Sequence, residues 1–228
     1  MAVDFIDLVS KLTDADRAVA QFRLRSVSPD AGKYGRESEP IAEYLSAEAE
    51  WKACAFFQKV LLETRVAFGS AESRHVEEVE RALPLFDPLN AALLEERVTK
   101  HDQLAVLEEL GRHISLETKA LLHPGTTSYD ILDTVRSYLL RECWNTVMRE
   151  KVSEVIESLC DLSPLYQQVL QVGRTHLQKT SPIPFGTTLA GYAARLAKRV
   201  EVCDRAFSSL KGKVSGIVGT GASVDFVR

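Results

Sequence analysis

Apolar residues recur at three- and four-residue steps over long stretches of the second half of this chain, a spacing that predicts amphipathic helices. One run extends from Ile131 to Leu162, and at 1.5 Å per residue it predicts a helix roughly 50 Å long. A second run covers residues 184–211. The segment between them, QVGRTHLQKTSPIPFG, is rich in Gly, Pro, Ser and Thr and predicts a turn. The two long helices are therefore expected to be antiparallel.

The first half of the chain predicts shorter helices. Their expected ranges are 14–25, 41–68, 73–83, 87–99 and 102–122, the last interrupted by Gly111. Residues 26–40, SVSPDAGKYGRESEP, combine Ser, Pro, Gly and charge and predict an exposed loop. No segment predicts a strand longer than a few residues. We expect an all-α fold, with a small helical domain over residues 1–122 and long helices over residues 123–228.

The long helices carry apolar residues on more than one side, which a single neighbouring helix cannot cover. The rest of the chain offers few elements of matching length, so the pattern predicts self-association into a helical bundle. The chain ends at SVDFVR, directly after a Gly-rich turn and without a polar tail. This ending gives the expectation that the chain is a truncated part of a longer protein.

Composition narrows the class of protein. Of the 228 residues, 45% are hydrophobic and 26% are charged, which is typical of a soluble globular protein. The net charge of −4 comes from 28 basic and 32 acidic residues mixed along the chain, so nucleic acid is not an expected partner. No apolar run is long enough to span a bilayer and the first residues do not form a secretory signal, so we expect a cytoplasmic protein without a membrane partner.

The four cysteines, Cys54, Cys143, Cys160 and Cys203, are widely spaced and form no CxxC pair. They therefore predict neither a zinc site nor a disulfide framework. The glycines of GKVSGIVGT, residues 212–220, do not fit a dinucleotide or Walker loop, because no GxGxxG follows a strand and no GK[ST] occurs. Nucleotide binding by those loops is not expected.

Five short polar or Gly-rich stretches lie at the ends of predicted helices. They are KYGR (33–36), TKHDQ (99–103), HPGTTSYD (123–130), GRTHLQ (173–178) and GKVSGIVGTGAS (212–223). Three of the five histidines, His101, His123 and His176, lie in such turns beside Thr, Ser, Arg or Asp. Imidazole transfers protons near neutral pH, so these three are candidate catalytic residues. The alternative is that each is a surface residue with a local hydrogen bond.

The HPGTTSYD stretch also has two interpretations. Ser128 or Thr127 can cap the long helix that follows, and Asp130 favours the positive end of its dipole. A helix N-terminus with free N–H groups and hydroxyls is equally a binding site for a carboxylate. Capping alone does not explain the histidine, the Pro-Gly turn and the two threonines together.

Taken in order, these motifs resemble the fumarase/aspartase superfamily, and within it most closely the adenylosuccinate lyase family. VTKHDQLAVLEEL is similar to the family's histidine-aspartate segment, HPGTTSYDILDT to its TSxD region, and VGRTHLQKTSPIPFG to its GRTH loop. GKVSGIVGT is similar to the turn after the next long helix, and KYGR with PIAEYLSAEAEW to the family's basic-Tyr-x-Arg opening. The resemblance extends from about Lys33 to Thr220.

The resemblance implies an enzyme of purine nucleotide biosynthesis that cleaves a C–N bond by β-elimination and releases fumarate. It implies a homotetramer with a central helical bundle, of which residues 123–228 are the first part, and active sites built from three subunits. It implies a small-molecule substrate and no metal or organic cofactor. His176 would be the general acid, with His123 close to it. Substrate-binding residues would be Thr127, Ser128, Asp130, His101, Asp102 and Thr175, with Lys33, Tyr34 and Arg36 near the nucleotide phosphate.

The sequence also departs from the family pattern. The family's general base is a serine in an SSxMPxKxNP loop, and no such stretch occurs in these 228 residues, so we expect the chain to be inactive alone. Leu177 stands where adenylosuccinate lyases often have glycine, which is similar to the argininosuccinate lyase or cycloisomerase versions. His176 argues against the cycloisomerase branch, and Thr127-Ser128 with KHD favours adenylosuccinate lyase. An argininosuccinate lyase-like enzyme and a non-catalytic helical assembly module are the alternatives.

Overall fold

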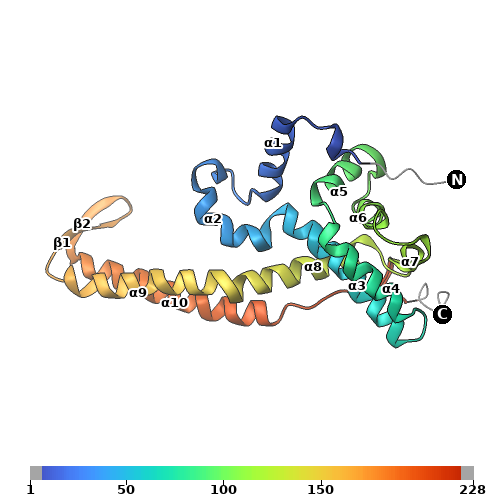
Figure 1. Ribbon diagram of the computed structural model, residues 1–228. Coiled ribbons are helices and arrows are strands. Elements are labelled where there is room, and N and C mark those ends of the chain that lie inside the picture. Colours follow the sequence, from blue (N-terminus) through green and yellow to red (C-terminus); the bar gives the residue numbers. More distant parts are fainter. Residues whose placement is uncertain (1–6, 222–228) are drawn as a thin grey trace. The chain divides into compact units, whose positions relative to one another are not determined.

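A computed structural model describes residues 7–221 of the chain, and it is built almost entirely of helices (Figure 1). The fifth motif therefore lies inside the described residues only up to position 221, and the SVDFVR ending lies outside them. The α-helices are α1 Asp14–Arg25, α2 Ala31–Leu45, α3 Ala47–Ala67, α4 Ser73–Ala82, α5 Pro88–Leu94, α6 Asp102–Gly111, α7 Leu116–Leu121, α8 Ser128–Cys143, α9 Arg149–Leu165 and α10 Phe185–Ser208.

Short helical turns and one hairpin complete the fold. The 3-10 turns are η1 Val9–Lys11 and η2 Leu83–Leu85, the π-helical turns are η3 Glu95–Thr99 and η4 Trp144–Met148, and the strands are β1 Leu170–Thr175 and β2 Gln178–Pro184. The expected all-α fold is confirmed, with this hairpin as its one small sheet among the described residues. No helix among residues 7–221 is long and apolar enough to cross a membrane.

The loop expected over residues 26–40 is wrong in its second half, because α2 begins at Ala31 and continues to Leu45. The backbone is kinked at Tyr34, where φ is −118° and ψ is 23°. The helix expected over residues 41–68 is also divided. Ser46 has extended backbone angles and its hydroxyl accepts a hydrogen bond from Ala49 N–H, so it ends α2 and caps α3.

The contacts divide the chain into two compact units. The first comprises the described parts of Met1–Leu140 and Lys211–Arg228, and the second is Arg141–Leu210. The expected domain boundary between residues 122 and 123 stays a prediction. Each unit has its own internal packing.

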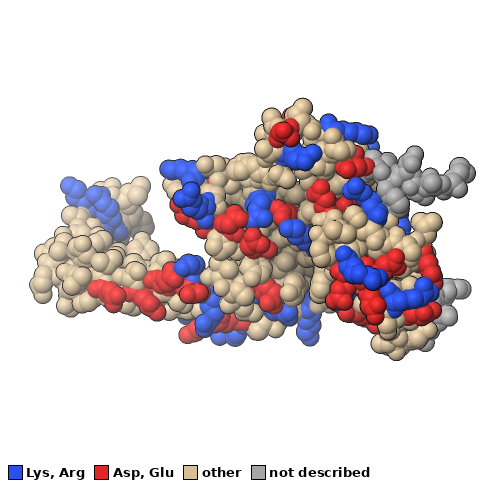
Figure 2. All heavy atoms as spheres, viewed as in Figure 1, with Lys and Arg blue, Asp and Glu red and all other residues tan. Residues whose placement is uncertain are grey.

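The core of the first unit brings α3, α4, α6 and α8 together. Leu62, Val79, Leu110 and Ile131, one from each of these helices, have no exposed surface. A smaller cluster joins Leu8 and Val9 to Leu89 and Leu94 of α5. Acidic and basic side chains are mixed on the face shown in Figure 2, in keeping with the mixed charge of the sequence.

The second unit contains α9, α10 and the β-hairpin. The helices α9 and α10 pack side by side, as expected for the two antiparallel runs (Figure 1). Asp204 links them to η4, since it accepts hydrogen bonds from Trp144 Nε1 at 2.9 Å and Arg149 Nε at 3.0 Å. At the other end Gly186 lies so close to α9 that a Cβ there would be 2.2 Å from the Ser163 carbonyl oxygen.

The segment between the long helices corrects the sequence prediction. It was expected to be a turn without a strand of more than a few residues, but β1 and β2 contain six and seven residues. They pair antiparallel from Leu170 opposite Pro184 to Thr175 opposite Gln178, with an irregularity between Val172 and Arg174. Only His176 and Leu177 remain as the two-residue turn.

Candidate functional site

The HPGTTSYD motif forms a tight turn that leads into α8. His123 and Gly125 have positive φ angles of 70° and 79°, so the chain reverses sharply before the helix begins. The Thr126 hydroxyl donates to the His123 carbonyl oxygen at 2.6 Å, and Arg65 of α3 donates to the Pro124 carbonyl oxygen at 2.5 Å. The turn is therefore held in place from inside and from α3.

The KHDQ motif forms the start of α6, and its histidine reaches the start of α8. Lys100 ends η3 with a φ of 52°, and His101 is the N-cap residue of α6. The Nδ1 atom of His101 accepts a hydrogen bond from Leu104 N–H at 3.3 Å. Its Nε2 atom lies 3.2 Å from Ser128 Oγ. Two motifs that are 27 residues apart thus meet through His101 and Ser128.

Asp130 joins the fifth motif to the same place. Its carboxylate has no exposed surface and accepts hydrogen bonds from Thr127 N–H at 3.0 Å, Ser215 N–H at 3.0 Å and Gly216 N–H at 2.9 Å. Lys213 Nζ lies 3.3 Å from the same carboxylate. Burial acts to raise the pKa of Asp130, but the hydrogen bonds from Ser215, Thr127, Gly216 and Lys213 outweigh it and lower the pKa.

The surroundings of Asp130 bear on the substrate-binding role that the resemblance implied for it. Both of its oxygens are already committed to donors of the protein, and the side chain is fully buried. A second carboxylate brought against it would also be repelled. Asp130 is therefore placed to orient the start of α8, while the neighbouring Thr127 and Ser128 remain half-buried at its N-terminus.

His123 occupies a half-buried position near these groups. Burial lowers the pKa of its imidazole, and the electrostatic effect of the nearby His101 lowers it further. Asp102 and Asp130 act in the opposite direction but do not compensate. The charged form of His123 is therefore disfavoured at this position.

Asp102 lines a cavity of about 230 Å³ between α3, α6 and α8. Other lining residues include Cys54 and the ion-paired Glu50 and Arg136, whose Nε lies 2.8 Å from a Glu50 oxygen. Burial raises the pKa of the Cys54 thiol to about 12, so this cysteine is not a nucleophile. Asp102 thus lines a cavity of mixed polar and apolar character next to the His101 turn.

Lys33, Tyr34 and Arg36 lie on α2 and are exposed. The Lys33 ammonium is positioned over the Tyr34 ring, 4.9 Å from its centroid. Among residues 7–221, no hydrogen bond or ion pair connects these three residues to the turns of His101 and His123. The structure therefore does not join the KYGR motif to the other motifs of the first unit.

The GRTH motif belongs to the second unit. Thr175 is the last residue of β1, and His176 and Leu177 form the turn with φ angles of 49° and 63°. All three side chains are exposed, and Leu177 is 88% exposed. The hairpin thus presents His176 at its tip.

Backbone strain coincides with these motifs. Among residues 7–221, the non-glycine residues with positive φ are Lys100, His123, His176 and Leu177. Such conformations cost free energy in L-residues and concentrate at functional sites. All four lie within the TKHDQ, HPGTTSYD and GRTHLQ stretches, where Lys100 ends η3 and His176 with Leu177 forms the hairpin turn.

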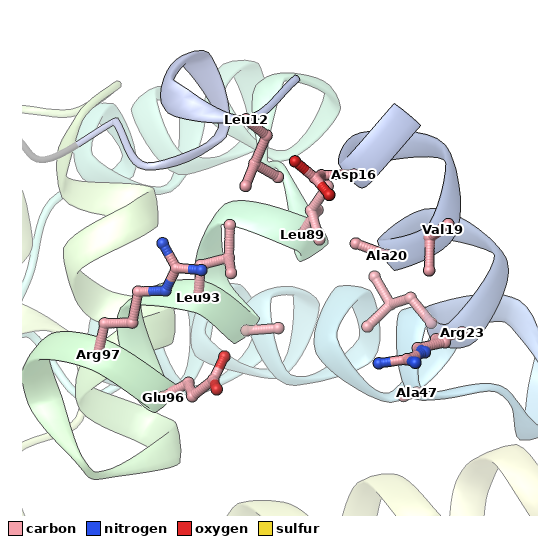
Figure 3. A pocket seen from close by; sticks show the side chains of 12 residues that line it. Leu12, Asp16, Val19, Ala20, Arg23, Ala47, Leu89, Leu93, Glu96 and Arg97 are labelled. Carbon is pink, nitrogen blue, oxygen red and sulfur yellow. The ribbon is translucent and has the colours of Figure 1, made fainter. Parts of the chain in front are cut away.

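A larger cleft lies elsewhere in the first unit. It has a volume of about 670 Å³ and is lined by Leu12 and by apolar residues of α1 and α5, with Arg23, Glu96 and Arg97 at its edge (Figure 3). None of the site residues predicted from the sequence is among those that line it. Size alone therefore does not identify the functional site of this protein.

We call the turns of His101 and His123, the start of α8 and the segment 213–216 the motif cluster. Several residues of this cluster were not predicted from the sequence. Thr126, Lys213, Ser215 and Gly216 lie inside the recognised motifs, but no role was assigned to them. Arg65 lies in the middle of α3, and no motif signals its contact with Pro124. A contact between distant segments of this kind becomes visible only in the fold.

Comparison with known families agrees with the motifs. A family model described as lyase matches residues 88–227, which covers the KHDQ, TTSYD, GRTH and GKVSG motifs. The chain belongs to this lyase family. Its membership confirms the resemblance to the fumarase/aspartase superfamily, and the sequence relatives of the chain include many adenylosuccinate lyases.

Three of these relatives indicate the extent of the likeness. The chain is 27% identical to adenylosuccinate lyase of Synechocystis sp. over 202 residues, covering 88% of this chain and 44% of the relative. It is 31% identical to adenylosuccinate lyase of Methanothermobacter thermautotrophicus over 183 residues, covering 76% of this chain and 40% of the relative. For adenylosuccinate lyase of Thermotoga maritima the identity is 33% over 130 residues, covering 57% of this chain and 30% of the relative. The chain spans less than half the length of these curated relatives.

Solved structures show the same fold. A fumarate lyase from Mesorhizobium sp. BNC1 superposes with a TM-score of 0.69 at 24% identity, covering 81% of this chain and 44% of the other. A β-carboxy-cis,cis-muconate cycloisomerase from Acinetobacter calcoaceticus gives a TM-score of 0.69 at 21% identity, with the same coverage. At these identities the likeness concerns the fold, and it does not distinguish between the activities of the two neighbours.

Proposed function

We propose that this chain is the N-terminal portion of a fumarate-releasing lyase that cleaves a C–N bond of adenylosuccinate by β-elimination. The observation that carries the proposal is the meeting of three separate motifs at the start of α8. Ser128 contacts His101 at 3.2 Å, and Asp130 accepts hydrogen bonds from Ser215 and Gly216. An assembly module would need caps at these helix ends, but it would not need the caps of different helices to converge.

The chemistry of β-elimination explains what such a cluster does. Removal of a proton next to a carboxylate builds negative charge on that carboxylate, so the site must supply hydrogen-bond donors. The hydroxyls of Thr127 and Ser128, at the positive end of the α8 dipole, are donors of this kind. We assign to Thr127 and Ser128 the binding of a substrate carboxylate.

The leaving nitrogen needs a proton as the C–N bond breaks. We assign this general-acid role to His176, with Thr175 beside it at the tip of the hairpin. His101 and Asp102 contact the substrate in this proposal, and Lys33, Tyr34 and Arg36 approach its phosphate. The exposed position of His176 in the second unit is compatible with a site completed by other subunits of a homotetramer.

The general base lies outside this chain in the proposal. Its 228 residues contain no SSxMPxKxNP stretch, and we propose that the isolated chain does not turn over substrate. The complete protein is proposed to act in purine nucleotide biosynthesis in the cytoplasm. A related succinyl adduct such as argininosuccinate is the alternative substrate, since Leu177 departs from the residue common in adenylosuccinate lyases.

Fumarate release tests the proposal. The complete protein is expected to release fumarate from adenylosuccinate and much less from argininosuccinate, whereas residues 1–228 alone are expected to release none from either. A complete protein inactive on both compounds would reject the lyase proposal. Robust turnover by residues 1–228 would reject the assignment of the base to a segment outside them.

A further inference from the structure

The hydrogen bonds of Thr126 determine which nitrogen of His123 carries the proton. The Thr126 hydroxyl has one hydrogen, and it donates that hydrogen to the His123 carbonyl oxygen at 2.6 Å. Its oxygen also lies 3.1 Å from His123 Nδ1. Since the hydroxyl hydrogen is already used, Thr126 can only accept at this second contact. Neutral His123 therefore carries its proton on Nδ1.

The other nitrogen of His123 is left with a lone pair. Among residues 7–221, no hydrogen bond to His123 Nε2 is found, although the residue is half-buried. A ligand that brings a hydrogen-bond donor to such a half-buried acceptor satisfies it, and this hydrogen bond favours binding of the ligand. His123 Nε2 is thus the acceptor of the motif cluster.

His101 has the opposite arrangement. Its Nδ1 accepts the Leu104 N–H at 3.3 Å, so the proton of the neutral ring is on Nε2 and is donated to Ser128 Oγ. Asp102 Oδ1 lies 3.4 Å from His101 Nδ1, which is longer than a good N–H···O hydrogen bond. Because His101 donates to Ser128, the hydroxyl hydrogen of Ser128 is free to point at an acceptor of the ligand.

We propose that the two histidines are held in opposite tautomers, so that His123 Nε2 accepts an N–H of the substrate while Ser128 donates to one of its carboxylates. This inference rests on the proposed function, whose substrate carries the nitrogen and the carboxylates on one four-carbon skeleton. No proton is transferred at His123 in this step. Its role is to orient the substrate through the nitrogen of the bond that breaks.

The tautomers can be measured in the unliganded chain by NMR with ¹⁵N-labelled histidine. The expected result is a pyrrole-type Nδ1 and a pyridine-type Nε2 for His123, with the reverse for His101. Thr126→Val removes the hydroxyl and is expected to shift His123 toward a mixture of tautomers. Thr126→Ser keeps the hydroxyl and is expected to restore the original pattern. An Nε2–H tautomer at His123 in the unmodified chain would overturn the inference.

Two ligands then distinguish the contact at His123 Nε2 from the carboxylate contact at Ser128. L-Aspartate has carboxylates and an ammonium donor, whereas succinate has the carboxylates alone. Aspartate is expected to shift the His123 Nε2 resonance as well as those of His101, while succinate is expected to shift only those of His101. No effect of aspartate on His123, or equal effects of the two ligands, would overturn the proposed contact.

The outcome is separable from that of the proposed function, since neither measurement requires turnover. In the complete enzyme, Thr126→Val is expected to raise KM about tenfold with a smaller change in kcat, and Thr126→Ser to return KM toward the original value. A complete protein that releases no fumarate but keeps both tautomers would reject the lyase and leave the hydrogen-bond assignment intact.

Discussion

Asp130 accepts a 2.9 Å hydrogen bond from the backbone N–H of Gly216, which lies 86 positions later in the chain. With the bond from Ser215 N–H, it attaches the segment after α10 to the first turn of α8. Thr134 reinforces the attachment, because its hydroxyl oxygen accepts from Lys213 N–H at 2.8 Å. The start of α8 is therefore fixed by contacts that are distant in sequence.

Replacing Asp130 by asparagine tests this attachment. The amide side chain would keep the size of the carboxylate, but it has one acceptor oxygen in place of two and carries no charge. Because hydrogen bonds to a buried charged group contribute about 1.5–3 kcal/mol, we expect Asp130→Asn to lower the free energy of unfolding by about 2 kcal/mol. Urea denaturation followed by circular dichroism measures this change.

Asp133→Asn is the matched control, because Asp133 lies one turn further along α8 and is exposed. It is expected to change the free energy of unfolding by less than about 0.5 kcal/mol. Hydrogen exchange provides a local readout, with the amides of Ser215 and Gly216 losing protection in Asp130→Asn only. Equal protection in both variants would contradict the attachment.

The low pKa of Asp130 predicts a dependence of stability on pH. A carboxyl group whose pKa is lower in the folded state stabilises the fold above the unfolded-state pKa, which is 3.8 for Asp. That contribution is lost as the pH falls through the folded-state pKa. We expect stability to decline below about pH 4, and Asp130→Asn to flatten the decline. An unchanged slope in the variant would exclude Asp130 as its source.

Two glycines of α10 provide a matched pair for the packing of the second unit. A Cβ at Gly186 would lie 2.2 Å from the Ser163 carbonyl oxygen, whereas at Gly191 its nearest neighbour is the Arg195 side chain at 3.8 Å. We expect Gly186→Ala to destabilise the unit by about 2–3 kcal/mol, because backbone must move. Gly191→Ala is expected to be neutral or to stabilise by up to about 1 kcal/mol. Thermal unfolding measures the melting temperature of each variant, and equal melting temperatures would contradict the close packing at Gly186.

Leu177 offers a test of backbone strain at the hairpin tip. Its φ is 63° and its side chain is 88% exposed, so the left-handed conformation is not offset by burial within the chain. We expect Leu177→Gly to stabilise the hairpin by about 1 kcal/mol. Gly173→Ala is the opposing variant, because a Cβ there would lie 2.5 Å from the Ser181 carbonyl oxygen. Amide exchange of β1 and β2 measures both, and a loss of protection in Leu177→Gly would contradict the strain.

His176→Ala tests the proposed general acid in the complete enzyme. General-acid catalysis contributes about 10²–10⁴-fold, so we expect kcat to fall at least about a hundredfold. His176 is exposed, and the urea midpoint is expected to stay within error of that of the unmodified protein. Turnover near the original level would reject the role of His176.

The sequence allowed much of the fold to be predicted, because the apolar residues of α8, α9 and α10 keep a helical period over many turns. The same reasoning failed at β1 and β2. Their segment contains Gly173, Pro182 and Pro184, which are typical of turns, and the strands are stabilised by pairing with each other. The start of α2 was missed for a similar reason, since Ser, Pro and Gly dominate its surroundings.

The candidate site was predictable where its residues lie in short contiguous motifs. His101 and Ser128 were both recognised, but their contact depends on the packing of α6 against α8 and could not be derived from spacing. Asp130 was recognised as well, yet its burial beneath Ser215 and Gly216 depends on a return of the chain from the second unit. Residue type thus predicted which groups matter, and only the fold indicated which group each one contacts.

The four left-handed residues have a consequence for protein engineering. Lys100, His123, His176 and Leu177 are the described non-glycine positions where glycine or asparagine would relieve strain. A selection for heat resistance alone would favour such replacements first. It would therefore enrich variants of this chain that resist heat but have lost His123 and His176, so any stabilisation effort should hold these positions constant.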